Sequence, residues 1–224
     1  MNRKKENIAT AIAILFHVIG LTGMLFFDTS FFASVSWLNM LLMLGLIIYT
    51  QQKVTAGFIF FFITCYFVGI AVEIAGTSTG AFFGDYHYTS VLGYPVLKVP
   101  IIIGVNWFIV MYCASVSMYM LSNNLQKEIN SVSPRWLKAT AIICDTALLA
   151  VIFDWLMEPA AIKLGFWKWM GDGTVPVFNY VSWLVVSALL AVFFYFIPFQ
   201  KQNKFAVNLL LIQAMFFLLI RTFL

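Results

Sequence analysis

The chain has 224 residues, of which 62% are hydrophobic and only 10% are charged, and its formal net charge is +4. Soluble domains carry about a quarter charged residues, so this composition excludes an ordinary soluble domain and indicates an integral membrane protein. Long unbroken apolar runs exclude a β-barrel and predict an all-α bundle. At about 20 apolar residues per span, the length accommodates about seven transmembrane helices in one polytopic membrane domain, residues 1–224.

The apolar runs predict seven transmembrane helices in chain order. They are residues 8–27, 35–50, 54–75, 99–121, 137–158, 177–199 and 205–222. If the N-terminus is cytoplasmic, nine of the 13 Lys and Arg residues lie on the cytoplasmic side and four on the far side. This bias predicts a cytoplasmic N-terminus, and we expect the bilayer to be a bacterial cytoplasmic membrane. The basic residues form no patch, so membrane orientation explains them better than a nucleic-acid partner does.

Two far-side connectors, residues 76–99 and 159–176, are rich in glycine and aromatic residues. Long structured connectors are usually functional. An aromatic belt at the headgroups would explain the Trp and Tyr residues, but it would not require so many glycines. We therefore expect these connectors to take part in a site.

The sequence around the two connectors contains a weak internal repeat. Each half has a Glu, a Pro, an Asn and a Trp in the same order. These residues are Glu73, Pro100, Asn106 and Trp107 in the first half and Glu158, Pro176, Asn179 and Trp183 in the second. A parallel internal repeat about an axis along the membrane normal would gather these residues around one cavity. The spacings differ between the halves, so chance stays open as the alternative.

Three acidic residues of the predicted spans should meet in one layer. Glu73 lies near the far-side end of its helix, and Asp154 and Glu158 are one turn apart near the far-side end of another. A charged carboxylate facing lipid costs about 2.5–3.5 kcal/mol, so such groups normally face a protein interior. Asp145 lies about 13 Å deeper on the opposite helix face and is not expected in this site.

Asn106 and Asn179 lie in the first turns of two helices that run inward, at the depth of the carboxylates. Helix capping or interhelical hydrogen bonding remains an equal alternative for both asparagines. Crowded carboxylates repel one another and lose hydration, so at least one should keep its proton near neutrality and serve as a proton donor.

Other features of the chain exclude several kinds of site. Gly69, Gly76 and Gly80 share a helix stripe with Glu73, where either a neighbouring helix or a flat elongated ligand could approach closely. The only histidines, His17 and His87, are far apart, so no metal site is expected. A retinal protein is excluded because the last span has no lysine for a Schiff base.

In combination, these residues resemble the CruF-type carotenoid biosynthesis family over roughly residues 65–190. The motifs that carry the resemblance are Gly69, Glu73, Gly76, Thr79, Gly80, Gly84, Tyr86 and Tyr88, then Val99-Pro100 and Asn106-Trp107, then Asp154, Glu158-Pro159, Trp167 and Trp169, and finally Pro176, Asn179 and Trp183. The first two helices and the last match only in hydropathy.

The resemblance implies a carotenoid hydratase that needs no cofactor and adds water across the terminal double bond of an acyclic carotenoid ψ-end. Protonation of this olefin requires a neutral carboxylic acid, and the resulting carbocation requires aromatic faces and carboxylates. Asp154 or Glu158 would be the proton donor, and Glu73 would orient water and stabilise the cation. Asn106 and Asn179 would position the reacting groups. Substrate-binding residues would be Gly76, Gly80, Tyr86, Tyr88, Trp107, Trp167, Trp169 and Trp183.

Three alternatives stay open at this point. A cyclase of the membrane lycopene-cyclase type shares the protonation step but lets an internal double bond trap the cation. A proton-coupled transporter also needs membrane-embedded acids, although inverted repeats or broken helices at the midplane would be expected there. A purely structural subunit leaves three unpaired carboxylates unexplained. The partners expected are a lipophilic carotenoid and the lipid bilayer, and a homo-oligomer or a complex with other carotenoid-pathway enzymes stays open.

Overall fold

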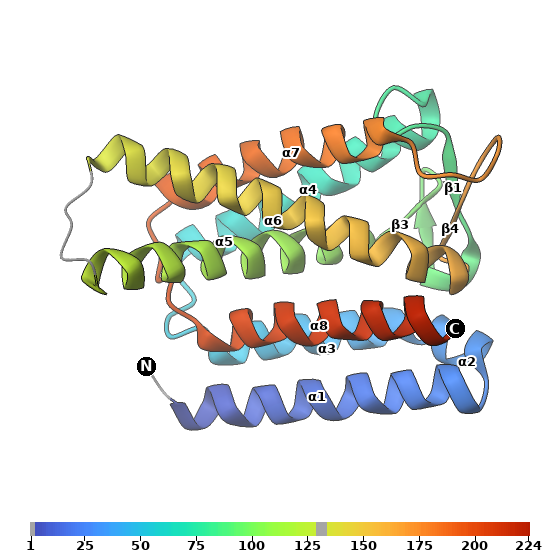
Figure 1. Cartoon of the computed structure of the whole chain (residues 1–224), viewed down its shortest axis with the longest axis horizontal. Helices are drawn as coiled ribbons and strands as arrows, with labels where there is room; N and C mark the ends of the chain where they lie inside the picture. The colour runs from blue at the N-terminus through green and yellow to red at the C-terminus, as the bar shows by residue number, and fades with distance from the viewer. Residues whose placement is uncertain (1–2, 129–133) are drawn as a thin grey trace.

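The computed structural model describes residues 3–128 and 134–224, which form a helical bundle with a few short strands at one end (Figure 1). The helices are α1 Arg3–Phe26, α2 Thr29–Ser34, α3 Ser36–Thr50, α4 Ala56–Thr79, α5 Ile102–Glu128, α6 Arg135–Lys163, α7 Val177–Phe196 and α8 Lys204–Phe223. The strands are β1 Tyr86–Tyr88, β2 Pro95–Val96, β3 Val99–Pro100 and β4 Trp167–Trp169, with a 3₁₀ turn at Ser90–Leu92.

The all-α membrane architecture expected from the sequence is confirmed. Within the described residues, six helices, α1 and α4–α8, are long and apolar enough to cross a membrane. Each coincides with a predicted span, and the largest extension is in α5, which continues to Glu128. The protein is therefore an integral membrane protein.

The predicted span over residues 35–50 differs from the others. It forms α3, which has only 15 residues, about 22 Å at 1.5 Å per residue. The backbone of Val35 leaves the helical region and separates α3 from the six-residue α2. Asp28 begins α2, because its carboxylate accepts a hydrogen bond from the Phe31 amide at 2.9 Å.

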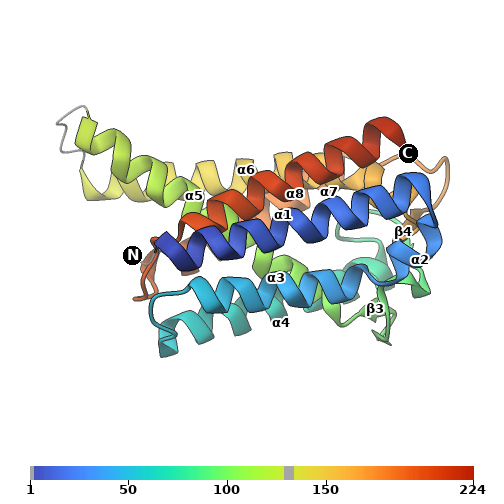
Figure 2. The same ribbon diagram turned by 90° about the horizontal axis from the view of Figure 1, so that it is seen from below.

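Helix α5 is the centre of the bundle. In its most apolar stretch 89% of the residues are buried, whereas the corresponding fraction for α1 and α4 is 28%. Helices α4, α6 and α7 lie on one side of α5, and α1, α3 and α8 lie on the other (Figures 1 and 2). The lipid-facing surfaces of the outer helices remain apolar, as a bilayer requires.

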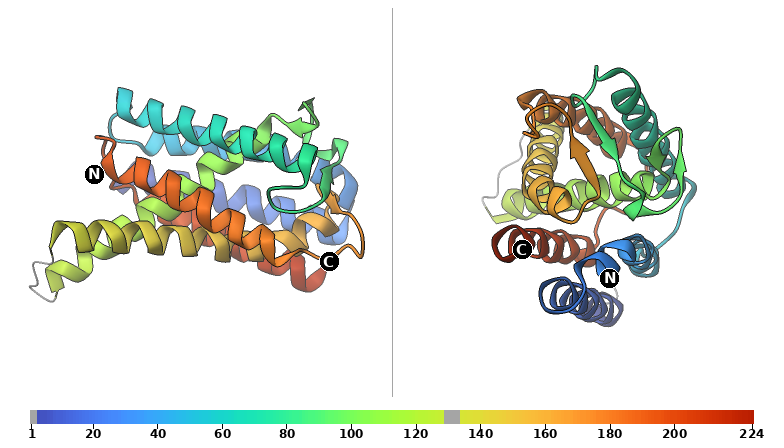
Figure 3. Two further views of the ribbon diagram at one scale, coloured as in Figure 1. Left: turned by 90° about the horizontal axis from the view of Figure 1, so that it is seen from above. Right: turned by 90° about the vertical axis from the view of Figure 1, so that its right-hand side faces the viewer.

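All four strands lie at one end of the bundle, which we call the ribbon end (Figure 3). Helices α4 and α6 run toward this end, and α5 and α7 run away from it, as the sequence predicts for Glu73 and Glu158 to meet. Strands β1 and β4 pair antiparallel, with His87 opposite Lys168 at the centre of the pair. This two-stranded ribbon joins the two aromatic connectors across the end of the bundle.

Candidate active site

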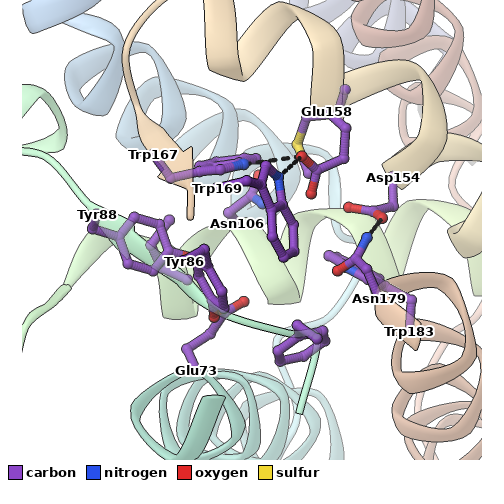
Figure 4. Close-up of a pocket in the computed structure, with 13 residues that line it drawn as sticks. Glu73, Tyr86, Tyr88, Asn106, Asp154, Glu158, Trp167, Trp169, Asn179 and Trp183 are labelled. Atoms are coloured by element: carbon purple, nitrogen blue, oxygen red, sulfur yellow. Dashed lines mark hydrogen bonds between the residues drawn. The ribbon is translucent and has the colours of Figure 1, made fainter. Parts of the chain in front are cut away.

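A small chamber lies beneath the ribbon, enclosed by α4, α5, α6 and α7 (Figure 4). The volume open to water-sized molecules is about 30 Å³, which is enough for one or two waters. Its walls are formed by Glu73, Phe83, Tyr86, Tyr88, Ile103, Asn106, Asp154, Met157, Glu158, Trp167, Trp169, Asn179 and Trp183. The three carboxylates that the sequence predicts to converge therefore line one cavity.

Glu73 of α4 is buried and accepts hydrogen bonds from three aromatic side chains. The hydroxyls of Tyr86 and Tyr88 both donate to Oε2, the second at 2.8 Å. The indole Nε1 of Trp107 donates to Oε1 at 3.0 Å. Hydrogen bonds from several donors favour the ionised form of a carboxyl group. The three donors fix the orientation of the Glu73 carboxyl group.

Glu158 of α6 is also buried, and it is held by the opposite strand of the ribbon. The indole nitrogens of Trp167 and Trp169 each donate to its Oε2 at 3.0 Å. Both donors act on Oε2, so Oε1 takes no part in these two hydrogen bonds. Because a Trp indole can only donate a hydrogen bond, Oε2 of Glu158 must accept both.

Asp154 lies one helical turn before Glu158 and is 1% exposed. Its Oδ2 accepts a hydrogen bond from Asn179 Nδ2 at 2.7 Å. Its Oδ1 is buried and has no hydrogen-bond partner among the described residues. An unpartnered buried oxygen is costly for an ion, whereas a protonated carboxyl needs only an acceptor or a substrate atom nearby.

The two halves of the chamber have matching parts. Each glutamate lies on a helix that runs toward the ribbon end, and each accepts two aromatic donors from the strand that follows its own helix. In the ribbon, Tyr86 is opposite Trp169 and Tyr88 is opposite Trp167, as a two-fold relation between the strands requires. The sequence leaves a parallel internal repeat and chance open as alternatives, and this correspondence is the one that a repeat would produce.

One of the differences between the halves gives the chamber its single aspartate. The residue one turn before Glu158 is Asp154, and the residue one turn before Glu73 is Gly69. A Cβ atom on Gly69 would lie 2.4 Å from the ring of Trp107, so glycine is required for that indole to reach Glu73. The first half thus contains a packed tryptophan where the second half contains an acid.

The hydroxyl groups of the two ribbon tyrosines, Tyr86 and Tyr88, remain protonated and act as hydrogen-bond donors. Burial, followed by the negative charge of Glu73, raises the pKa of the Tyr86 hydroxyl. The same two causes raise the pKa of Tyr88 well above its usual value. Both groups therefore stay protonated and keep their hydrogen bonds to Glu73 over the physiological pH range.

Several sequence-predicted site residues lie outside the chamber wall. Gly76 faces the Phe83 ring and the Tyr86 hydroxyl, and a Cβ atom there would lie 3.0 and 3.1 Å from them. Gly80 ends α4 with φ of 65°, so its role is to close the helix. Trp107 touches Glu73 rather than forming the wall. The glycine stripe therefore admits aromatic side chains of this chain.

Three apolar wall residues were not predicted: Phe83, Ile103 and Met157. The sequence offered a signal for Phe83, which lies in the aromatic connector over residues 76–99, and for Met157, which lies between Asp154 and Glu158 on α6. Asn106 lines the chamber but makes no hydrogen bond to a carboxylate in residues 3–128 and 134–224. No group of three or more His, Cys, Asp or Glu side chains in the same ranges has metal-binding geometry.

The fold and the chamber define a membrane-embedded helical bundle with a buried cluster of acids and aromatic rings, and buried acids within membrane helices usually mark a functional site. The chain belongs to the carotenoid biosynthesis protein family, whose family model matches residues 31–224. The predicted family is thus confirmed, and the match extends beyond residues 65–190 to include α3 and α8. No curated protein and no solved structure matched the chain.

Proposed function

We propose that this protein is a carotenoid 1,2-hydratase that acts on the terminal double bond of an acyclic ψ-end. The observation that carries the proposal is the unpartnered Oδ1 of Asp154 in a chamber that also contains two hydrogen-bonded glutamates. In this proposal Asp154 is the proton donor, Glu73 is a fixed anion and Glu158 is the base. No cofactor takes part.

The first step is protonation of the olefin by Asp154. The proton passes from the Asp154 carboxyl to C2 of the terminal trisubstituted double bond, and C1 becomes a tertiary carbocation. Asn179 holds the other Asp154 oxygen at 2.7 Å, so the acid keeps one orientation. A carboxylic acid kept neutral at working pH is suited to general acid catalysis.

The cation is stabilised by negative charge and by aromatic faces. Glu73 contributes a carboxylate that its three donors hold in place, so it needs no reorganisation during the reaction. The rings of Tyr86, Trp169 and Trp183 line the same chamber, and the electron-rich face of an aromatic ring attracts a cation.

Water addition completes the reaction and returns the proton. A water oxygen forms a bond to C1 while one of its protons passes to Glu158, and the product is a tertiary alcohol. The proton then returns from Glu158 to Asp154, which lies one turn away on the same helix. The net change is the addition of one water to one double bond, with both acids restored.

The chamber is suited to water but is tight for a carotenoid end. Its water-accessible volume of about 30 Å³ is smaller than a terminal isoprene unit, so substrate binding requires wall side chains to move. Met157 is the wall residue best suited to do so, because its side chain is unbranched and flexible. We infer that the terminal unit alone enters while the polyene stays in the bilayer.

The proposed topology follows from the charge bias. We propose that the N-terminus faces the cytoplasm of a bacterial cell and that the ribbon end, with the chamber, faces the opposite side of the cytoplasmic membrane. Nine of 13 basic residues lie on the cytoplasmic side in that orientation. Water then reaches the chamber from the membrane surface.

The test is expression in a bacterial host engineered to accumulate acyclic carotenoids, followed by mass spectrometry of the pigments. A product heavier by one water per reacted end is expected. An isomer of unchanged mass would instead support the cyclase. Unchanged pigment with several ψ-end substrates, despite folded protein in the membrane, would contradict both enzymatic proposals.

A further inference from the structure

A second cavity lies on the other side of the bundle, between α1, α3 and α8 and far from the three carboxylates in sequence. Its water-accessible volume is about 430 Å³, within the range of pockets that hold small molecules. Nearly all of its wall is apolar, and α1 contributes Phe16, Ile19 and Met24 to it. The exceptions are His17, Ser36 and Asn39.

His17 presents a hydrogen-bond acceptor in this apolar setting. The side chain is 6% exposed, and its Nδ1 lies 2.8 Å from the carbonyl oxygen of Ala13. A carbonyl can only accept, so Nδ1 carries the proton, and in a neutral imidazole Nε2 is then an acceptor. Nε2 has no hydrogen bond to the described parts of the chain.

Asn39 supplies a second polar group to the same cavity. Its Oδ1 is buried without a hydrogen-bond partner in the described residues. A carboxamide offers two donors and an acceptor. Ser36 differs, because its hydroxyl already donates to the Phe32 carbonyl at 3.2 Å.

We propose that this cavity binds a long-chain lipophile bearing a hydroxyl group. A hydroxyl can donate to His17 Nε2 and accept from the Asn39 amide, and the chain lies along the apolar wall. A plain hydrocarbon would leave His17 Nε2 and the Asn39 amide donor without a ligand partner, and a charged headgroup would meet no opposite charge among the wall residues. The proposal does not depend on the reaction assigned to the chamber.

Two sources share this ligand chemistry. One is a hydroxylated carotenoid, as the proposed reaction would make, and the other is a primary isoprenoid alcohol of the membrane. The probes are therefore an acyclic 1-hydroxy carotenoid and geranylgeraniol, each compared with its methyl ether, which keeps the oxygen but cannot donate. Equilibrium binding is measured with the full chain in nanodiscs.

At least one alcohol should bind about 10-fold more tightly than its ether, as expected for one hydrogen bond of about 1.4 kcal/mol. The alcohol that shows the preference identifies the source. His17→Phe, which keeps a ring against Phe216, should remove the preference, and His17→Gln should retain part of it. Asn39→Leu should weaken the binding of alcohol and ether alike, because the oxygen of either ligand accepts from the Asn39 amide.

Gln213→Leu is the matched control, because Gln213 also has a buried unpartnered oxygen but does not line this cavity. It should leave the preference unchanged. Equal binding of alcohol and ether by the unaltered protein would overturn the proposal, and so would a preference that persists in His17→Phe or unchanged binding of both ligands by Asn39→Leu. Asp154→Asn should bind the alcohol normally, so failure of the proposed reaction and failure of this site are distinguishable.

Discussion

Trp107 and Trp183 stack with their ring centroids 4.1 Å apart and their planes 11° apart. Trp107 follows Pro100 at the same spacing as Trp183 follows Pro176, so the stack joins equivalent positions of the two halves. Within the described residues, Trp107 donates a hydrogen bond to Glu73 and Trp183 does not.

This difference gives the first prediction. Trp107→Phe keeps a ring in the stack but removes a donor from Glu73, and a hydrogen bond to a charged group contributes about 1.5–3 kcal/mol. We expect hydration to slow by about 10- to 100-fold. Trp136→Phe, the control at an exposed tryptophan that does not line the chamber, should leave the rate unchanged, and equal losses in the two variants would contradict the role given to the Trp107 indole.

Substitution of Glu73, Asp154 or Glu158 should affect turnover far more than substitution of an acidic residue outside the chamber. Glu73→Gln, Glu158→Gln and Asp154→Asn should each abolish turnover, because each removes a charge or a proton without changing side-chain size. The thermal unfolding midpoint should stay near that of the unaltered protein. Glu128→Gln, at the exposed opposite end of α5, is the control and should remain active. Near-native turnover in both glutamate variants would refute the scheme.

Asn179 is predicted to be a positioning residue rather than a reacting one. Asn179→Leu removes the 2.7 Å hydrogen bond to Asp154 and leaves both acid oxygens free. A neutral hydrogen bond contributes about 0.5–1.5 kcal/mol, so the rate should fall about 2- to 12-fold without being lost. Asn179→Gln should recover part of the rate. Complete loss in both variants, with the protein folded, would indicate a direct role in the reaction.

The ribbon tyrosines predict how stability depends on pH. The pKa of Tyr86 is raised in the folded protein, whereas an unfolded tyrosine ionises near about 10. Above that pH the unfolded chain releases the proton and the folded chain keeps it, so folding stability is present below about pH 10 and falls as pH rises further. The unfolding midpoint measured from neutral to strongly alkaline pH should show this fall, and Tyr86→Phe should reduce it. An identical fall in Tyr86→Phe would contradict the prediction.

Gly84 is predicted to be required for closing the ribbon end. Its φ is 121°, and a Cβ atom there would lie 2.7 Å from the Pro176 ring at the start of α7. Gly84→Ala therefore combines backbone strain of about 1–3 kcal/mol with a steric clash. Gly173→Ala is the matched control, since Gly173 also has a positive φ but has no atom within 4 Å of the added Cβ. Thermal unfolding should show a larger loss for Gly84→Ala, and equal losses would refute the clash.

The sequence predicted the bundle and the carboxylate layer because both follow from simple regularities. Apolar length defines spans, and alternating helix direction brings Glu73, Asp154 and Glu158 to one end. The predicted span over residues 35–50 nearly matches α3, whereas the short helix α2 was not predicted, because hydropathy does not reveal the non-helical backbone of Val35 that separates the two helices.

Partner assignments within the site could not be predicted from the sequence. Which tryptophan binds which glutamate depends on the pairing of β1 with β4, two short strands that are distant along the chain. Likewise, the glycine stripe indicated a close approach but did not identify its occupants, Trp107 at Gly69 and Phe83 at Gly76. A small residue in the sequence indicates that another group approaches it closely, but the fold determines which side chain that is.

The most direct test of the proposed reaction is turnover of an acyclic ψ-end carotenoid by the purified protein in D₂O enriched in ¹⁸O. Hydration through Asp154 predicts one ¹⁸O hydroxyl at C1 and one deuterium at C2 for each reacted end, and no product from Asp154→Asn. A deuterated isomer without ¹⁸O, or labelled alcohol formed equally well by Asp154→Asn, would contradict the assignment.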